Sequence, residues 1–99
     1  MIRHVISWTL LEQDVAKKAE NSAMISAQLM SLPELIPEII TMTVSSNFVK
    51  IDGNWDLVLI ADYADEEALK TYIAHPEHQK VVAVIKPFFE KRAAVDFLV

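Results

Sequence analysis

The chain contains no cysteine, only one glycine and no long apolar run. Without cysteine it can form neither a disulfide framework nor a thiol-based site. Because Gly53 is the only glycine, no glycine-rich loop can cradle a phosphate group. No apolar stretch reaches the ~20 residues that span a bilayer, and the opening MIRHVISWTLLEQD turns acidic too early for a secretory signal. These absences predict a cytoplasmic protein.

Positive charge is also scarce. The chain has 9 Lys and Arg residues against 14 Asp and Glu, a formal net charge of −5. Binding to nucleic acid requires clustered basic side chains that replace counterions, and anionic membranes attract basic segments in the same way. We therefore expect neither nucleic acid nor a membrane as a partner.

Apolar side chains, in contrast, are abundant. They make up 53% of the 99 residues, which is incompatible with a disordered chain. A chain of this length is expected to form a single domain, residues 1–99, with one small core. An apolar excess in so small a domain indicates that part of its surface is covered by another subunit.

The pattern of residues predicts the order β-α-β-β-α-β. Alternation and β-branched residues predict four strands, at 2–10, 39–49, 55–64 and 92–99. Asp14 and Asp65 are expected to cap the helices between them. The second helix should break at Pro76, because the residue before a proline avoids helical geometry, and a further helical segment is expected over 76–91.

This order is typical of an α+β, ferredoxin-like fold, in which a four-stranded antiparallel sheet carries helices on one face. The 55–64 strand is apolar on both faces, with Leu57 and Leu59 on one side and Val58 and Ile60 on the other. A strand with two apolar faces has to be covered on both sides. We therefore expect the sheets of two copies to pack face to face in a homodimer.

The segment YIAHPEHQ (72–79) is the most unusual part of the chain, since it contains two of the three histidines. If Pro76 begins a helix, His78 lies in the first turn, where the partial positive charge disfavours imidazolium and leaves a neutral general base. The alternative is an ordinary polar residue at a helix start. Tyr72 is either a hydrogen-bond donor to a substrate carbonyl or an amphipathic core residue. His75, together with Pro76, is expected to act as a structural helix cap.

The third histidine, His4, lies on the apolar face of the first predicted strand. It is either a core histidine with a hydrogen-bond partner or a polar group of a pocket. If this face meets the helices, His4 approaches Tyr72 and His78 from the sheet. The apolar walls of such a pocket would come from Leu57, Leu59 and Met24.

The histidines do not predict a metal site. Pro76 separates His75 from His78, and no helical H-E-x-x-H motif is present. We expect no zinc and no cofactor, and a weak Mg²⁺ or Ca²⁺ site at a loop is left open.

Four segments match a known family in their order along the chain: RHVISWTL, IPEI, WDLVLIADYADEEALKTYIAHPEHQKVV and AVDF. With them the chain resembles the stress-responsive α/β-barrel domain family, also called the dimeric α-β barrel or Dabb family. Its Y-x-x-H-P-x-H core is the most specific of these pieces. The resemblance covers essentially the whole chain, and it implies a ferredoxin-like monomer whose sheet joins that of a second copy in an α/β barrel.

The resemblance implies less about activity. Most members look like small proteins of unassigned function. A minority are similar to a plant polyketide cyclase and close an aromatic ring by intramolecular aldol condensation. In those enzymes the second histidine of H-P-x-H, here His78, is the base, and the tyrosine, here Tyr72, works with it. A related class of monooxygenases shares the dimeric barrel.

Two kinds of function therefore stay open. The first is a small dimeric protein without assigned chemistry, whose pocket between sheet and helices holds a small apolar or ketide-like ligand. The second is an enzyme, either a cofactor-free, cyclase-like aldol catalyst with a histidine base or a monooxygenase-like protein. An enzyme requires His4, Tyr72 and His78 to converge on one cavity.

Overall fold

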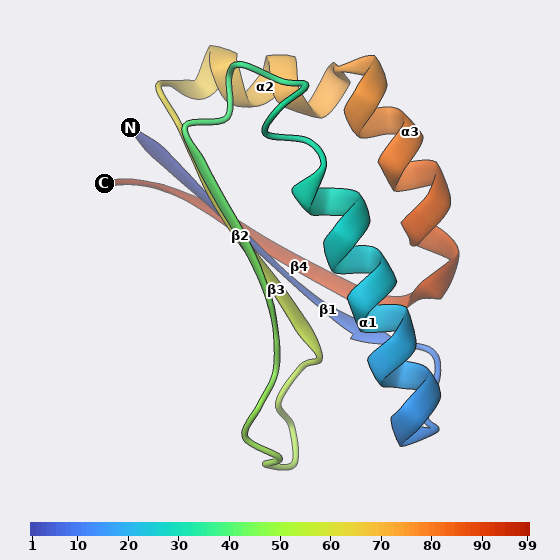
Figure 1. Cartoon of the computed structure of the whole chain (residues 1–99). Coiled ribbons are helices and arrows are strands. Elements are labelled where there is room, and N and C mark those ends of the chain that lie inside the picture. Colours follow the sequence, from blue (N-terminus) through green and yellow to red (C-terminus); the bar gives the residue numbers. More distant parts are fainter.

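Four strands and three α-helices follow one another in the predicted order, with the second helix divided into two. The computed structural model describes residues 1–99. The elements are β1 (Ile2–Leu10), α1 (Val15–Met30), β2 (Thr41–Ser46), β3 (Leu57–Tyr63), α2 (Glu66–Ala74), α3 (Pro76–Ile85), a 3₁₀ turn (Lys86–Phe88) and β4 (Phe89–Leu98) (Figure 1). No helix has the length and apolar character needed to cross a membrane.

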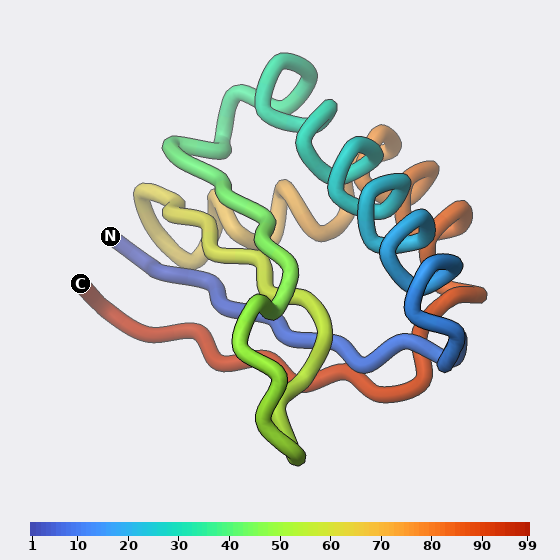
Figure 2. The backbone as a smooth tube through the Cα atoms, turned by 60° about the horizontal axis from the view of Figure 1, so that its bottom comes forward, coloured from blue at the N-terminus to red at the C-terminus, as the bar shows by residue number.

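The strands form one antiparallel sheet in the order β2-β3-β1-β4. The helices all cover the same face of this sheet (Figures 1 and 2). The two chain ends lie side by side, since Ile2 of β1 is opposite Leu98 of β4. This arrangement is the ferredoxin-like fold, and the prediction from the sequence is confirmed.

The predicted helix starts are confirmed by their caps. The Asp14 carboxylate accepts a hydrogen bond from the Lys17 amide at 3.0 Å, and the Asp65 carboxylate accepts one from the Ala68 amide at 2.8 Å. Each cap satisfies one of the amides that a helix leaves free in its first turn. Short local signals of this kind are readable from sequence because both partners lie within three residues of each other.

Two boundaries differ from the prediction. The helical segment expected over 76–91 ends at Ile85, and β4 begins at Phe89 rather than at residue 92. Pro87 has no amide hydrogen for a helical bond, so the chain passes through a 3₁₀ turn and leaves the helix. Phe89 then stacks on Trp8 of β1 with ring centroids 4.8 Å apart, which favours an early start of the strand.

The second strand is also shorter than expected, because its pairing ends at Ser46. The Asn47 amide still donates to the Asp56 carbonyl, and the chain then leaves the sheet in a loop that turns at Gly53, where φ is +94°. A positive φ of this size suits glycine, which has no Cβ. The apolar residues that suggested a longer strand lie in this loop, with the Phe48 side chain 91% exposed.

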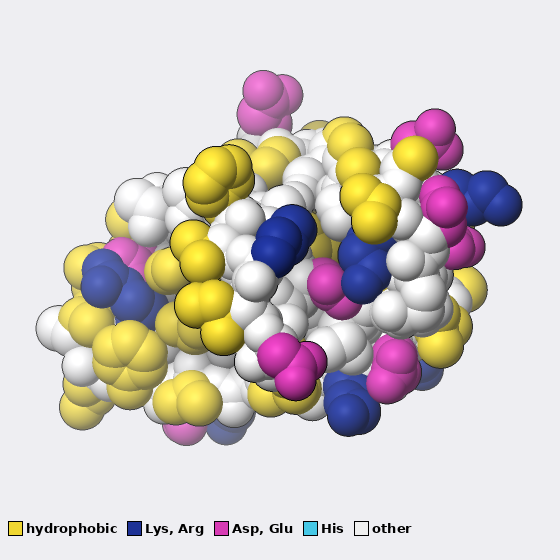
Figure 3. Space-filling model, turned by 90° about the horizontal axis from the view of Figure 1, so that it is seen from below, with side chains coloured by type: hydrophobic (Ala, Val, Ile, Leu, Met, Phe, Trp, Pro, Cys, Tyr) yellow, Lys and Arg dark blue, Asp and Glu magenta, His cyan; other side chains and the backbone are white.

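The sheet has one buried face and one open face. Under the helices, every second residue of β1 from His4 to Leu10 is buried. On the open face, Val95 and Phe97 of β4 and Ile60 of β3 are 63%, 42% and 39% exposed. Arg3 and Asp62 form a bidentate ion pair beside them, with N–O distances of 2.9 and 3.0 Å. Seen from below, hydrophobic side chains gather on the half of the surface that lies toward the chain ends (Figure 3).

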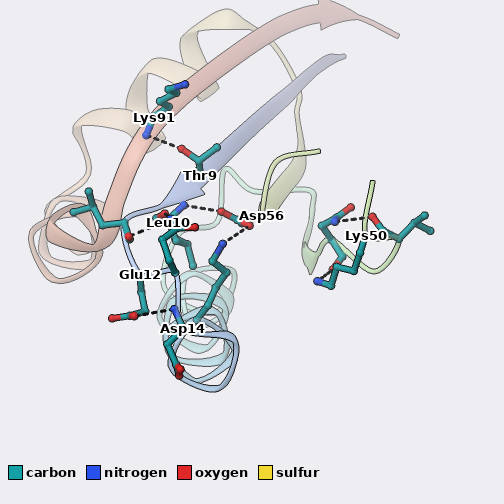
Figure 4. Close-up of polar contacts among 12 residues, drawn as sticks. Thr9, Leu10, Glu12, Asp14, Lys50, Asp56 and Lys91 are labelled. Atoms are coloured by element: carbon teal, nitrogen blue, oxygen red, sulfur yellow. Dashed lines mark hydrogen bonds and ion pairs between the residues drawn. The ribbon is translucent and has the colours of Figure 1, made fainter. Parts of the chain in front are cut away.

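Asp56 joins the end of β1 to α1 and to the start of β3. One carboxylate oxygen accepts from the Leu10 amide at 2.8 Å, and the other accepts from the Lys18 ammonium at 3.2 Å (Figure 4). Replacing Asp56 by alanine removes both bonds and leaves a part-buried amide unpaired. We expect Asp56→Ala to lower the free energy of unfolding by about 1–3 kcal/mol, measured by guanidinium denaturation.

The matched control for this prediction is Asp52→Ala, in the exposed loop between β2 and β3. It removes the same charge and should change the free energy of unfolding by less than about 0.5 kcal/mol. All proteins are compared at one concentration, because subunit association would add to the apparent stability. Equal losses in the two variants would contradict a specific role for Asp56.

Candidate functional site

A cavity lies between α3 and the buried face of the sheet. Its volume is about 340 Å³ and fourteen residues line it, a size near the lower end of ligand pockets in proteins. The lining residues with polar groups are His4, Tyr72, His78, Gln79, Lys86 and Arg92. The apolar ones are Ile6, Trp8, Leu29, Leu59, Ile73, Val82, Ile85 and Phe89.

The break between α2 and α3 leaves a backbone carbonyl free, and this carbonyl positions His78. In an unbroken helix the Ile73 carbonyl would accept from the amide of Glu77. That amide instead donates to the Nδ1 atom of His75, the N-cap of α3, at 3.1 Å. Pro76 occupies the first turn and has no amide to offer. The Ile73 carbonyl is thus left available to side chains.

His78 uses this free carbonyl. Its Nδ1 atom lies 2.9 Å from the Ile73 oxygen, and the Gln79 side-chain amide donates to the same oxygen at 2.7 Å. A carbonyl can only accept, so Nδ1 carries the proton and Nε2 of the neutral ring has a free lone pair. Burial lowers the pKa of His78, and the bond to Ile73 opposes this shift only in part. His78 is therefore neutral at pH 7 and able to accept a proton at Nε2.

Tyr72 lies directly against this histidine. The centroids of the two rings are 4.3 Å apart, and the tyrosine side chain is almost fully buried. Burial raises the pKa of Tyr72 to about 12. The Tyr72 hydroxyl therefore stays protonated at neutral pH and can donate a hydrogen bond.

Tyr63 of β3 lies behind Tyr72, with ring centroids 5.1 Å apart. Its hydroxyl is buried and has no hydrogen-bond partner. Burial first of all, and then the neighbouring Tyr72, raise the pKa of Tyr63 well above its usual value. Tyr63 thus supports the Tyr72 ring as a neutral, close-packed neighbour.

His4 approaches the same cavity from the sheet, and its side chain is only 4% exposed. Its Nδ1 atom is bonded to the carboxylate of Asp96, which lies directly opposite on β4. A carboxylate that accepts a hydrogen bond from Nδ1–H keeps a proton on Nδ1 and so fixes the tautomer of the ring. The His4 and Tyr72 rings are 6.4 Å apart, in an edge-to-face arrangement.

Of the six residues expected at the pocket, four line this cavity and two do not. His4, Tyr72, His78 and Leu59 line it, whereas Leu57 and Met24 are absent from its walls. Met24 belongs to α1, which lies on the same face as α3 but packs mainly against β2, at the sheet edge away from β4. Leu57 is buried beside its cross-strand neighbour Trp8, and Trp8 forms the wall instead.

Four polar residues at or near the cavity were missed by the sequence reasoning: Gln79, Lys86, Arg92 and Asp96. Arg92 lies opposite Trp8 on β4, as Asp96 lies opposite His4. Their proximity depends on the register between the first and last strands, which no local pattern reveals. The only available signal was the alternation of β4, which places Arg92 and Asp96 on one face.

The other surface sites contain fewer side chains that could act as a base or as a hydrogen-bond donor. A more open cleft of about 630 Å³ between α1 and the β2–β3 loop contains neither a histidine nor a tyrosine. The Lys18–Asp56 ion pair forms part of its wall. No group of three or more His, Asp or Glu side chains is arranged to hold a metal ion.

Solved structures similar to this chain share its whole length. A dimeric ferredoxin-like protein of unknown function from Thermobifida fusca is 28% identical, with a TM-score of 0.83 over 99% of this chain and 90% of that one. A dimeric protein of unknown function from Bacteroides fragilis is 24% identical, with a TM-score of 0.86 over 97% and 93%. A hydroxynitrile lyase from Passiflora edulis is 13% identical, with a TM-score of 0.81 over 99% and 92%, and this likeness concerns the fold alone.

No curated protein matches the sequence. The family model for the stress responsive A/B barrel domain, in contrast, matches residues 2–99. That match includes every strand, every helix and all the residues of the cavity, and the chain belongs to the Dabb family of stress responsive A/B barrel domains.

Proposed function

We propose that this Dabb protein is a homodimer that catalyses cofactor-free proton transfer on a small, enolisable carbonyl compound. One observation carries the proposal: a neutral histidine with a free Nε2 and a protonated tyrosine lie against each other in the wall of one cavity. A base and a hydrogen-bond donor at the same place are what enolisation requires.

In the proposed reaction, Nε2 of His78 removes a proton from the carbon next to the substrate carbonyl. The electron pair of that C–H bond moves into the enolate, and negative charge develops on the carbonyl oxygen. The Tyr72 hydroxyl donates a hydrogen bond to this oxygen. The enolate then regains the proton from His78, or its carbon attacks a second carbonyl of the same molecule in an aldol step that closes a ring, and the alkoxide formed on the second carbonyl oxygen takes the proton from His78.

The His4–Asp96 pair has a positioning role in this proposal. The hydrogen bond from His4 to Asp96 fixes the His4 ring edge-to-face with the Tyr72 ring. A buried ring fixed in this way keeps Tyr72 against His78 and excludes water from the reacting groups. A ketide-like compound, which carries several carbonyl groups, is the corresponding substrate class for the aldol step.

Two independent features support the homodimer. The open face of the sheet exposes Val95, Phe97 and Ile60, side chains that a monomer would leave in water. The relatives from Thermobifida fusca and Bacteroides fragilis are both described as dimeric. We propose that two open faces pack together about a two-fold axis.

The proposal is tested by hydrogen exchange. Enolisable ketones and β-keto thioesters are incubated with the protein in D₂O, and loss of the α-proton signal is followed by NMR. Exchange above the buffer rate supports catalysis. Binding of the same compounds without exchange would instead indicate a ligand-binding protein, and substrate-dependent uptake of O₂ would indicate the monooxygenase-like alternative.

Tyr72→Phe gives a further prediction. The phenylalanine ring keeps the contact with His78 but cannot donate a hydrogen bond to the enolate oxygen. We expect the exchange rate constant to fall by about 10²- to 10³-fold, the usual effect of removing one oxyanion-hole donor from an enzyme, with little change in KM. Tyr63→Phe is the matched control, because it removes the neighbouring buried hydroxyl, and an equal loss there would contradict the assignment.

A further inference from the structure

The cavity is basic although the protein as a whole is acidic. The chain has 14 acidic and 9 basic side chains. None of the fourteen residues that line the cavity is acidic, yet two are basic, Lys86 and Arg92, and two are histidines. A concave site with one sign of charge concentrates ligands of the opposite sign.

Neither cation is neutralised within the chain. The ion pairs of the protein involve neither Lys86 nor Arg92. Asp96 lies on the same face of β4 as Arg92, but four residues along the strand, about 13 Å away, and its carboxylate is bonded to His4. Two unpaired cations beside apolar walls are available to a ligand that brings its own negative charge.

The cations and the proposed reacting groups lie at different ends of the cavity. His78 is in the first turn of α3, and Lys86 follows the last turn, eight residues later, about 12 Å along the helix. On the sheet, Trp8 follows His4 by four residues along β1, about 13 Å. Arg92 lies opposite Trp8 on β4. The wall between the two ends is apolar and includes Ile6 of β1 and Val82 of α3, and the stack of Trp8 on Phe89 lies at the Arg92 end.

We propose that the ligand of this cavity is an amphipathic organic anion whose carboxylate binds Arg92 and Lys86. The planar guanidinium of Arg92 can hold a carboxylate with two hydrogen bonds, and Lys86 adds a second positive charge. The apolar body of the ligand then extends from the Trp8–Phe89 stack along Ile6 and Val82 toward His78. This inference rests on the proposed function only in placing the reacting carbonyl at the His78 end.

Three ligands of equal chain length test the charge preference: octanoate, octanamide and octylammonium. Isothermal titration calorimetry at low salt should show octanoate binding at least about tenfold more tightly than octanamide, since hydrogen bonds to a charged group are the stronger kind. Octylammonium should bind most weakly. The preference for octanoate should decrease as salt is added, because salt screens partly exposed charges.

The double substitution Arg92→Gln and Lys86→Gln should remove the preference. We expect its affinity for octanoate to fall by about tenfold and its affinity for octanamide to stay unchanged. The matched control is Lys91→Gln, a basic residue next to Arg92 that lies on the opposite face of β4, beside Thr9. This control should keep the full preference for octanoate.

Several results would overturn the inference: no binding of octanoate, equal binding of octanoate and octanamide, or a preference for octylammonium. Loss of octanoate binding in Lys91→Gln to the same degree as in the double variant would also overturn it. The proposed catalysis is tested separately. A protein without exchange activity can still prefer octanoate, so failure of the catalytic proposal would leave this inference intact. A His78→Gln variant that keeps this preference confirms that the two claims are independent.

Discussion

Replacing His78 by glutamine is expected to lower the rate of α-proton exchange by about 10²- to 10⁴-fold, the usual contribution of a positioned general base. Glutamine has a similar reach and can still donate to the Ile73 carbonyl, so α3 should keep its first turn. It has no nitrogen with a free lone pair to accept a proton. The measurement is the exchange rate constant by NMR in D₂O at pD near neutrality.

His75→Gln is the matched control for this prediction. It changes a histidine three residues earlier that lies outside the cavity lining and accepts a hydrogen bond from the Glu77 amide. Loss of that cap should lower the free energy of unfolding by about 1 kcal/mol and leave the exchange rate of the folded protein nearly unchanged. Equal rate losses in the two variants would contradict a special role for His78.

The pH dependence gives the same prediction a second measurement. The pKa of His78 lies below its usual 6.5 because burial disfavours the charged ring. The base form therefore predominates at pH 7, and activity is expected to be lost as the pH falls below 6.5, through the lowered pKa. A rate that declines already between pH 8 and 7 would assign the essential base to another group.

The part of this site that lies within one stretch of chain could be predicted from sequence. The proline that begins the third helix, the cap at His75 and the first-turn position of His78 all depend on residues within a few positions of one another. The same holds for the caps at Asp14 and Asp65. Local steric and hydrogen-bond rules determine such features, and the order of the elements follows from them.

The remainder depends on contacts between distant segments. Asp96 meets His4 only because β4 pairs with β1 in one particular register, and a shift of one residue would turn Asp96 to the open face. Arg92 lies near the cavity for the same reason. Leu57 and Met24 do not line the cavity, because the sequence reveals neither which strands α1 covers nor that Trp8 lies beside Leu57 and forms the wall.

The open face of the sheet provides the second prediction with a large expected effect. Val95 lies on this face in the edge strand β4, opposite Val5 of β1, which is itself opposite Ile60 of β3. If two open faces pack together, Val95→Lys places an unpaired ammonium group in the interface, where burial of a charge is costly. A two-fold axis introduces this charge twice, once from each subunit.

We expect Val95→Lys to weaken dimerisation at least about 100-fold, since a charge buried without a partner costs several kcal/mol. Sedimentation at micromolar concentration should give twice the chain mass of 11.2 kDa for the natural sequence and a value near 11.2 kDa for the variant.

Val84→Lys is the matched control, because Val84 of α3 is also exposed but lies on the helix side of the molecule. The face-to-face dimer is contradicted if Val95→Lys keeps the doubled mass, or if the natural sequence itself sediments as a single chain. Dissociation by Val84→Lys alone would assign the interface to the helices, and the open face of the sheet would then need another partner.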